Sequence, residues 1–255
     1  MKNLLIVGIT GRMGRIIHRL AGEYDFKVCG GIADQAGEID GVTVAGPDDP
    51  YAVSDTAPDC IIDFSGQAGF RLALNLVEHH KIPLVSGSTG LEDNDIHRLL
   101  DIAAKVPVLL ASNMSVGINL LLSLLPRVTE ALGPTYDTEI VELHHNQKID
   151  APSGTALALA EALASGTFRA GSELVCGRNR QSGVRTDHEI GIHGVRGGDV
   201  VGDHTVYYLG PGERIEITHR AHSRETFARG ALRAAGFLLQ QKPGRYTMRD
   251  VLGLS

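Results

Sequence analysis

Hydrophobic residues follow one pattern in the first part of the chain and another in the second. Up to about residue 112, short apolar runs alternate with longer stretches in which apolar residues recur every three or four positions. The short runs are typical of strands buried on both faces, and the longer stretches are typical of helices. This alternation predicts a parallel, doubly wound sheet with helices on both sides. The expected strands are 2–7, 27–33, 42–45, 59–64, 82–86 and 107–110, and the expected helices are 16–23, 68–80 and 92–104.

After Asn113 the pattern changes to one long apolar helix followed by longer strands. Residues 116–132 should form that helix, which Pro126 should kink or end because proline lacks an amide hydrogen. Along 213–220 apolar and polar residues alternate, which is typical of a sheet with one face in water. The other expected elements are strands at about 138–144, 188–193 and 200–208, a helix at 153–166 and a long mobile loop at 171–187.

These elements predict two domains. The helix expected at 224–240 should return to the first domain, because the second sheet already has helices of its own. We therefore expect a discontinuous first domain, 1–114 with 224–255, and an inserted second domain, 115–223. The first should be an α/β fold built on a doubly wound parallel sheet, and the second an α+β domain with a mixed open sheet.

Composition narrows the classes of function. The 255 residues are 43% hydrophobic and 21% charged, as in an ordinary globular protein. Aromatic residues make up 5%, tryptophan is absent and the net charge is −6, all of which disfavour a nucleic-acid partner. No apolar stretch approaches the roughly 20 residues of a membrane helix, and the three cysteines form no CxxC pair. We expect a cytoplasmic protein of a reducing compartment that binds neither nucleic acid nor membrane.

A glycine-rich loop separates the first strand from the first helix. In dinucleotide-binding proteins one glycine of such a loop permits a tight turn, a second lets the backbone approach the pyrophosphate, and a third lets the helix pack against the strand. Gly8, Gly11 and Gly14 could take these roles, although the GxxGxxG spacing alone is as typical of an ordinary turn. The candidate cofactor contacts in this loop are Gly8, Ile9, Thr10, Gly11, Arg12 and Met13.

An acidic residue follows the second expected strand. Asp34 lies 20 residues beyond Gly14, and dinucleotide-binding units place an acid about 20 residues on, where it accepts hydrogen bonds from the ribose hydroxyls. A solvated acid at a strand end is the alternative. Gln35 stands where an NADP site often has a basic residue, and Asp34 would repel a 2′-phosphate. NADH should therefore bind at least as well as NADPH, although Arg12 could partner a 2′-phosphate.

Two further polar loops follow strands of the same predicted sheet. Ligands of open α/β sheets bind at the carboxyl ends of the strands, so both loops are candidates for cofactor contacts. Their candidate residues are Gly87, Ser88 and Thr89 in the first loop and Ala111, Ser112, Asn113 and Met114 in the second.

The stretch from Thr138 to Ala156 holds the densest group of chemically active residues. A strand delivers His144, His145 and Lys148 to a loop, and that loop leads to a helix that Ser153 could cap. A helix N-terminus presents amide hydrogens and the positive end of the helix dipole, which suits a carboxylate. The stretch therefore suits a small dianionic substrate that must be protonated. Adjacent histidines on a strand point to opposite faces, so one of them could instead be an ordinary core residue.

Other active-site chemistries find little support. The chain has no HExxH motif and no paired CxxC motif, so we expect no bound metal. Ser153 lacks the GxSxG turn that presents a nucleophilic serine.

These motifs together resemble the dihydrodipicolinate reductase (4-hydroxy-tetrahydrodipicolinate reductase) family of lysine and diaminopimelate biosynthesis, which has a Rossmann-type first domain. The resemblance covers nearly the whole chain, and the histidine–lysine block is its most specific part. The motifs are GITGRMG at 8–14, GSTG at 87–90, ASNMSVG at 111–117, ELHHNQKIDAPSGTA at 142–156, VRGGDVVGDHTV at 195–206, ERIEITHRAHSRETFARGA at 213–231 and the terminal MRDVL.

The resemblance implies a role for each candidate residue. His144 matches the general acid, which protonates the ring carbon next to the one that receives hydride. Lys148 matches a second catalytic residue that stabilises charge on the substrate. The substrate carboxylates would be bound by His145, Ser153, Gly154 and Thr155. The first domain would bind NADH, which Gln35 favours, or NADPH. The second domain would bind substrate and assemble a homotetramer through its sheet.

Two other classes of function stay open at this point. A different two-domain oxidoreductase, such as a semialdehyde dehydrogenase, needs a cysteine nucleophile, but Cys29 and Cys60 lie in expected strands and Cys176 lies in the expected loop. A non-catalytic dinucleotide sensor would keep the glycine loop and Asp34, but it would have no use for the histidine–lysine block.

Overall fold

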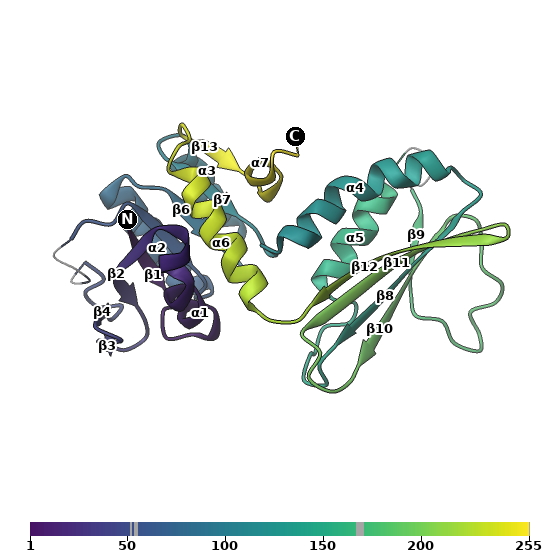
Figure 1. Cartoon of the computed structure of the whole chain (residues 1–255), viewed down its shortest axis with the longest axis horizontal. Helices are drawn as coiled ribbons and strands as arrows, with labels where there is room; N and C mark the ends of the chain where they lie inside the picture. Colours follow the sequence, from purple (N-terminus) through teal and green to yellow (C-terminus); the bar gives the residue numbers. More distant parts are fainter. Residues whose placement is uncertain (52, 54–55, 167–170, 255) are drawn as a thin grey trace. The chain divides into compact units, whose positions relative to one another are not determined.

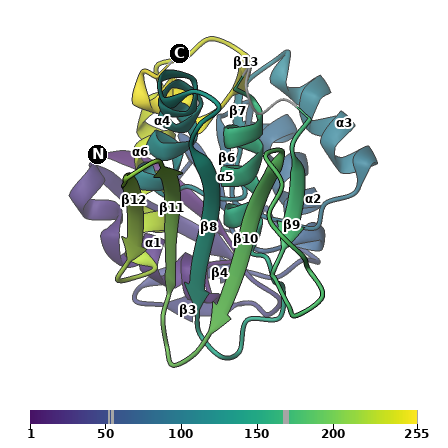
Figure 2. The same ribbon diagram turned by 90° about the vertical axis from the view of Figure 1, so that its right-hand side faces the viewer.

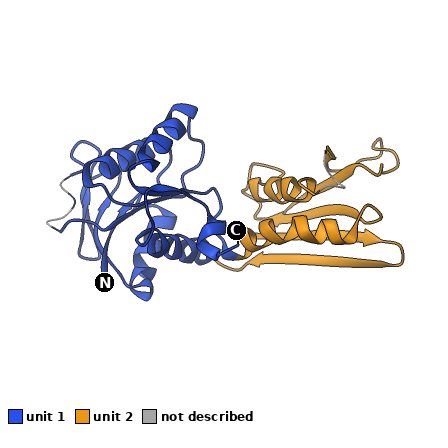
Figure 3. Ribbon diagram, turned by 90° about the horizontal axis from the view of Figure 1, so that it is seen from above, with its two compact units in different colours: residues 1–116, 224–255 blue, residues 117–223 orange. Residues whose placement is uncertain are grey.

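The computed structural model describes residues 1–51, 53, 56–166 and 171–254 of the chain. They form two compact units, shown in blue and orange in Figure 3. Unit 1 consists of Met1–Val116 and Arg224–Ser255, and unit 2 consists of Gly117–Ser223.

Unit 1 is built on an eight-stranded sheet in the order β13-β7-β6-β5-β1-β2-β4-β3 (Figure 1). Every neighbouring pair is parallel except β3 and β4, which run antiparallel at one edge. The strands are β1 (Lys2–Val7), β2 (Phe26–Ile32), β3 (Gly37–Ile39), β4 (Val42–Ala45), β5 (Cys60–Asp63), β6 (Leu84–Ser86), β7 (Pro107–Leu110) and β13 (Gly244–Tyr246). The helices are α1 (Arg12–Leu20), α2 (Gln67–His80), α3 (Asp93–Ala103), α6 (Glu225–Leu238) and α7 (Met248–Leu252), with a 3₁₀ turn at Ala21–Tyr24.

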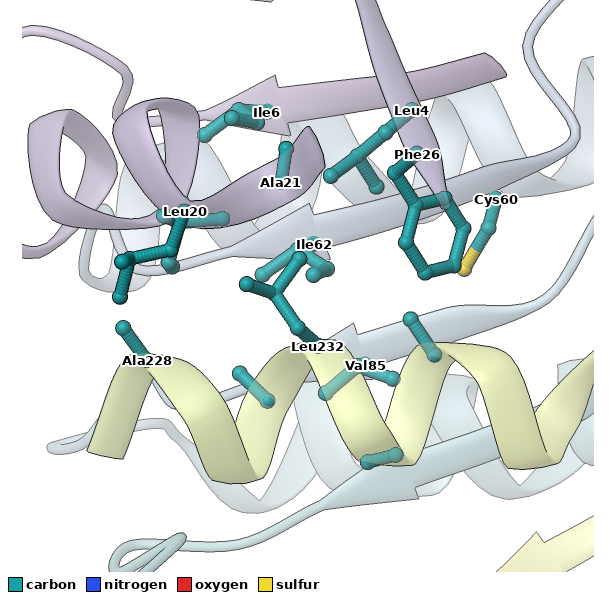
Figure 4. Close-up of a cluster of buried hydrophobic side chains, with 14 of the residues drawn as sticks. Leu4, Ile6, Leu20, Ala21, Phe26, Cys60, Ile62, Val85, Ala228 and Leu232 are labelled. Atoms are coloured by element: carbon teal, nitrogen blue, oxygen red, sulfur yellow. The ribbon is translucent and has the colours of Figure 1, made fainter. Parts of the chain in front are cut away.

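The central strand β1 buries its side chains on both faces of this sheet. Leu4 and Ile6 join a core that includes side chains from α1 and α6, part of which Figure 4 shows. Leu5 and Val7 join a second core with side chains from α2 and α3. Successive residues of a strand point to opposite faces, so an unbroken apolar run needs a helical layer on each side. The predicted doubly wound parallel sheet is confirmed.

Unit 2 contains a five-stranded mixed sheet in the order β12-β11-β8-β10-β9 (Figure 2). Strands β8, β10 and β9 run parallel to one another, and β11 is antiparallel to both β8 and β12. Its core joins Ile140, Ile192 and Tyr208 of the sheet to Leu125 and Leu159 of the helices. The predicted mixed sheet is confirmed. The elements are α4 (Val116–Leu132), β8 (Asp137–His144), α5 (Gly154–Ala164), β9 (Glu173–Cys176), β10 (Glu189–Arg196), β11 (Gly202–Gly210) and β12 (Glu213–Ala221).

Two expectations for unit 2 are narrowed or corrected. Pro126, expected to kink or end the long helix, does not end it: α4 continues to Leu132, and burial of Leu121 and Leu125 on the core side offsets the lost hydrogen bond. The segment expected as a long loop contains β9, which pairs in parallel with β10. Two of its three arginines are also bound: Arg178 and Arg185 both form ion pairs with Glu139. The Gly-, Ser- and Arg-rich composition did not indicate these long-range partners.

Three short elements of unit 1 lie outside the sequence-based expectations. Strand β3 adds an antiparallel edge, and β13 pairs with β7 at the opposite edge. Helix α7 begins with a capping box in which Thr247 and Asp250 bond each other's backbone amides. The spacing of these two residues is a known helix-start signal.

Candidate active site

Unit 1 has a cavity of about 320 Å³ at the carboxyl end of β1 and β2. Four predicted cofactor residues line it: Gly8, Thr10, Gly11 and Asp34. The rest of the lining is Val7, Ile32, Ala33, Pro47, Phe64, Ser65, Ala68, Gly69 and Leu72. The glycine loop and the acid after the second strand therefore face the same space.

The glycine loop is shaped by the absence of side chains. Gly8 has a φ of +83°, and a Cβ there would lie 2.9 Å from the carbonyl oxygen of Phe64. A Cβ on Gly14 would lie 2.1 Å from the carbonyl oxygen of Gly8. Gly11 precedes α1 with no side-chain cap, so the first amides of the helix are available to a pyrophosphate. These residues fit a dinucleotide.

The other predicted residues of this loop have different environments. Ile9 is fully buried in the core and Met13 packs against it, so their side chains support the loop from behind. Arg12, Asp34 and Gln35 are all exposed. Asp34 is the one of these three that lines the cavity.

The second and third predicted loops follow β6 and β7, which pair in parallel next to β5. Thr89 and Ser112 are exposed at their tips. Ser88 is only 6% exposed, and Met114 is buried in the core. Asn113 accepts a hydrogen bond from the amide of Ser115. Gly87 and Ala111 are half-buried. None of the seven predicted residues in these loops is among the described residues that line the cavity.

In unit 2, His144 ends β8 with its ring buried beside Glu142. The Nδ1 atom of His144 lies 2.5 Å from Oε2 of Glu142, whose side chain is fully buried. Residues two apart on a strand share a face, so β8 itself places these two side chains together. Burial lowers the pKa of His144 below its usual value, although the Glu142 carboxylate opposes this shift.

Arg196 completes this charged group from the neighbouring strand β10. The register of the sheet sets Arg196 opposite His144. Its guanidinium binds both oxygens of Glu142, at 2.7 and 2.9 Å. Burial acts to raise the pKa of Glu142, but hydrogen bonds from Arg196 and His144 outweigh it and hold that pKa below its usual value. Glu142 is therefore an anion that orients His144 by its Nδ1 atom, and Nε2 is the ring nitrogen that Glu142 does not contact.

A second histidine lies against the first. The ring centroids of His204 and His144 are 5.1 Å apart, and Nε2 of His204 lies 3.1 Å from Oγ of Ser153. Burial lowers the pKa of His204 to about 4. His204 is therefore neutral at pH 7 and adds no positive charge beside His144.

The polar block after β8 forms an ordered turn. The amides of His145 and Lys148 donate to the carbonyls of Val200 and His145, respectively. The Lys148 ammonium lies 2.7 and 2.9 Å from the two oxygens of Asp150, and this contact lowers the pKa of Asp150. The turn thus holds a half-buried cation, Lys148, three residues after His145 and four after His144.

The turn leads into the N-terminus of α5. Ser153 is the N-cap, and its hydroxyl accepts from the amide of Ala156 at 3.2 Å. The amide of Ser153 donates to Glu142 at 3.2 Å, which ties the helix start to the charged group. Gly154 is exposed, and a Cβ there would meet no atom within 4 Å. Thr155 is half-buried in the same first turn. This helix end has the open space that a carboxylate needs.

Sequence reasoning missed four residues of this group: Glu142, Asp150, Arg196 and His204. Glu142 could have been found, because it precedes His144 by two positions on a strand. Arg196 and His204 reach the site only through strand pairing, so nothing in the local sequence signals them. Among the described residues, no group of three or more histidine, cysteine or acidic side chains could hold a metal ion, and no helix is long and apolar enough to cross a membrane.

Both parts of the chain match one family. Residues 2–114 match "dihydrodipicolinate reductase, N-terminus" and residues 117–252 match "dihydrodipicolinate reductase, C-terminus". The chain belongs to the dihydrodipicolinate reductase family. The predicted family is thereby confirmed, as is the predicted class, an oxidoreductase of lysine and diaminopimelate biosynthesis.

Similar proteins agree with this assignment along the full length. The chain is 45% identical to a 4-hydroxy-tetrahydrodipicolinate reductase of Desulfovibrio desulfuricans, with 97% of this chain and 98% of that protein covered. It is 44% identical to a protein of the same name from Myxococcus xanthus, with 99% and 98% covered. A solved structure, dipicolinate-bound dihydrodipicolinate reductase from Paenisporosarcina sp. TG-14, has the same fold, with a TM-score of 0.77, 20% identity and 97% of each chain covered.

Proposed function

We propose that this chain reduces 4-hydroxy-tetrahydrodipicolinate (dihydrodipicolinate) to tetrahydrodipicolinate with a nicotinamide cofactor, and that His144 supplies the proton. The observation that carries this proposal is the buried Glu142–His144 pair beside Lys148 and the N-terminus of α5. A proton donor, a cation and a helix end together suit a dianionic ring. The relative from Paenisporosarcina, whose structure has dipicolinate bound, supports a small dicarboxylate.

The residues of unit 2 would handle the charge and the proton. When bound, the nicotinamide supplies a hydride to C4 of the substrate ring, and C3 then needs a proton. His144 would donate it from Nε2, because Glu142 holds Nδ1. Lys148, His145 and the first turn of α5, with Ser153 as cap and Gly154 and Thr155 as its first residues, would hold the carboxylates. Such fixed charges stabilise charge that develops in the transition state.

The residues of unit 1 would hold the cofactor. Gly8, Thr10, Gly11 and the start of α1 would bind the pyrophosphate, and Asp34 would accept hydrogen bonds from the adenosine ribose. The exposed Asp34–Gln35 pair offers a 2′-phosphate an anion and no cation, which supports a preference for NADH over NADPH. The loops at Gly87–Thr89 and Ala111–Met114 would complete the site. Closure of the substrate-binding domain on the cofactor domain would accompany catalysis.

We expect the assembly and the cellular compartment to be those that the family resemblance implies. We propose a homotetramer formed through the sheet of unit 2, whose face opposite α5 carries partly exposed apolar residues such as Val141 and Val195. A cytoplasmic location is consistent with cysteines that are few and widely spaced along the chain, at positions 29, 60 and 176.

The rival chemistry of a semialdehyde dehydrogenase lacks a suitable nucleophile. Burial raises the pKa of the Cys60 thiol to about 12, so it is not a thiolate at neutral pH. Cys29 lies within β2, where its thiol points to the carbonyl of Leu4. Cys176 is exposed at the end of the edge strand β9, in the part of unit 2 that β10 separates from His144.

The test is oxidation of NADH, and separately of NADPH, with freshly generated dihydrodipicolinate-type substrate. Wild type should turn over with NADH preferred, and Gln35→Arg should shift the ratio of kcat/KM values toward NADPH. Tight dinucleotide binding without turnover would leave the fold standing and remove the reaction. Turnover with an unchanged cofactor ratio in Gln35→Arg would remove only the account of cofactor preference.

A further inference from the structure

A buried carboxylate, that of Asp63, lies at the carboxyl end of β5. Asp63 is the last residue of β5 and is fully buried. The sheet register places it between Val7, which precedes the glycine loop, and Ser86, the last residue of β6. It therefore lies where three neighbouring strands end, at the edge of the sheet that binds ligands in this type of fold.

The groups that surround Asp63 are hydrogen-bond donors. The hydroxyls of Ser86 and Ser88 lie 2.7 and 2.8 Å from its Oδ2 atom. Its Oδ1 atom accepts from the hydroxyl and, at 3.1 Å, from the amide of Ser65. Burial raises the pKa of Asp63, and these serine hydrogen bonds oppose the rise. A site with four donors is matched to a carboxylate, which accepts only.

The hydroxyls of Ser86 and Ser88 also accept hydrogen bonds from backbone amides of two loops. The Ser88 hydroxyl accepts from the amides of Ser65 and Gly66, at 3.2 and 2.9 Å. The Ser86 hydroxyl accepts from the amide of Ser88 at 3.2 Å. The loop after β5 and the loop after β6 are therefore bonded to each other through one carboxylate and its serines.

The loop after β5 also packs closely against α2 and against the loop after β6. A Cβ on Gly69 would lie 2.1 Å from the hydroxyl oxygen of Ser65, and a Cβ on Gly87 would lie 2.2 Å from the ring of Phe64. Each glycine thus leaves room for a side chain of the loop after β5. That loop has little freedom to adopt another conformation while Asp63 keeps its partners.

This arrangement borders the cofactor cavity. Phe64, Ser65 and Gly69 line the cavity together with Gly8 and Asp34. We infer that Asp63 is a positioning residue for cofactor binding, which fixes the cavity wall at Phe64 and Ser65 and joins it to the Gly87–Thr89 loop. This inference rests on the proposed use of the cavity by a dinucleotide, and it assigns Ser88 a role inside the wall rather than at the cofactor itself.

The physical reason is preorganisation. In Asp63→Asn one carboxylate oxygen becomes an amide nitrogen, which donates instead of accepting, so the serine hydrogen bonds to that oxygen are lost and the wall must be ordered again each time the cofactor binds. The expected loss in Asp63→Asn is about tenfold or more in dinucleotide affinity, which corresponds to about 1.4 kcal/mol per factor of ten. Turnover at saturating cofactor should change far less, because the proton donor lies in unit 2.

The experiment measures the Kd for NADH by direct titration, together with KM and kcat, for three variants of the full chain. Asp63→Asn and Ser88→Ala should both raise the Kd and the KM for NADH, with kcat within about threefold of wild type. Asp59→Asn is the matched control, since Asp59 immediately precedes the same strand and accepts from the Asn3 amide at its opposite end. It should leave the Kd unchanged. A thermal melt of each variant shows how much structure is lost.

Several outcomes would overturn the inference. Asp63→Asn and Ser88→Ala could bind NADH with wild-type affinity, in which case Asp63 is only a stabilising core group. Asp59→Asn could lose as much affinity as Asp63→Asn, in which case the effect is general destabilisation. If Asp63→Asn does not fold, Ser88→Ala decides alone. If wild type binds NADH but does not reduce the substrate, the proposed reaction is wrong. The role of Asp63 can still be tested in that case, because titration with NADH needs no substrate.

Discussion

The two candidate sites of this chain are built from different kinds of chemical group. The cavity of unit 1 is shaped by glycines, backbone groups and uncharged side chains, with Asp34 as its one charged lining residue among those described. The site of unit 2 is a group of ionisable side chains that hold one another: Glu142, His144, Lys148, Asp150, Arg196 and His204.

This difference indicates how each site should respond to amino-acid substitutions. A cavity made by missing side chains is damaged by adding atoms, and the damage should appear in cofactor affinity. A group of coupled charges is damaged by removing one partner, and the damage should appear in turnover, in pH dependence and in stability. The predictions below test this division, from the largest expected effect to the smallest.

The largest effect is expected from the proton donor and its neighbouring cation. His144→Gln and Lys148→Ala should lower kcat by about 10²- to 10⁴-fold, the usual contribution of general acid catalysis, and leave the Kd for NADH nearly unchanged. His188→Gln, an exposed histidine just before β10, is the control and should behave as wild type. A comparable loss of NADH affinity in the His144 or Lys148 variant would contradict the division between the two units.

The second effect concerns the glycine loop. Gly14→Ala places a Cβ 2.1 Å from the carbonyl oxygen of Gly8, so the backbone must shift. We expect the Kd for NADH to rise by about 10- to 100-fold, since overpacking costs roughly 1–3 kcal/mol. Gly22→Ala is the matched control, because a Cβ there meets no atom within 4 Å. If both variants bind NADH like wild type, the loop is not the cofactor site.

The third prediction separates stability from catalysis at the buried ion pair. Glu142→Gln leaves Arg196 without its anion and replaces one of the two acceptor oxygens shared by His144 and Arg196 with an amide group that donates. It should reduce the free energy of unfolding by about 3–5 kcal/mol and kcat/KM by at least about tenfold. Glu142→Gln combined with Arg196→Met removes both charges and should recover much of the stability, measured by denaturant titration. Recovery of kcat/KM in this double variant would show that Glu142 has no part in orienting His144.

The smallest effect is a difference in pH dependence between kcat/KM and kcat. Burial lowers the pKa of His144 in the free protein, and the proposed mechanism uses the acid form of His144 as the proton donor. The kcat/KM should therefore be constant at low pH and fall as pH rises through a value below the ordinary histidine pKa of about 6.5. The groups that face His144 are Glu142, Lys148, Arg196 and His204, and the pKa of His204, about 4, keeps it neutral in this range.

The kcat profile should fall at a higher pH than the kcat/KM profile. It reports the complex, in which the dianionic substrate stabilises protonated His144 and raises its pKa. The two profiles are measured with saturating NADH. Coincident descending limbs would mean that the substrate carboxylates do not influence His144.

The sequence indicated the parts of this protein that depend on local patterns. Apolar runs separated by helical periods identified nearly every long strand and helix, because buried parallel strands and amphipathic helices impose different spacings. The turn of small residues at Gly8–Gly14 and the polar block from His144 to Thr155 were visible for the same reason. The family resemblance also depended on these contiguous motifs.

Only the tertiary structure showed which residues from distant segments meet. Arg196 reaches Glu142 because β10 pairs with β8, His204 reaches His144 because β11 pairs with β8 on its other side, and the Asp63 network exists because β5 pairs with β6. Arg178 and Arg185, which lie between β9 and β10, form ion pairs with Glu139 of β8 and likewise meet it only in the folded chain. The local sequence determines which reactive side chains and which helices and strands are present, since composition and hydrophobic periodicity are local properties. Strand register determines which charges are neighbours, and it forms only when the sheet does.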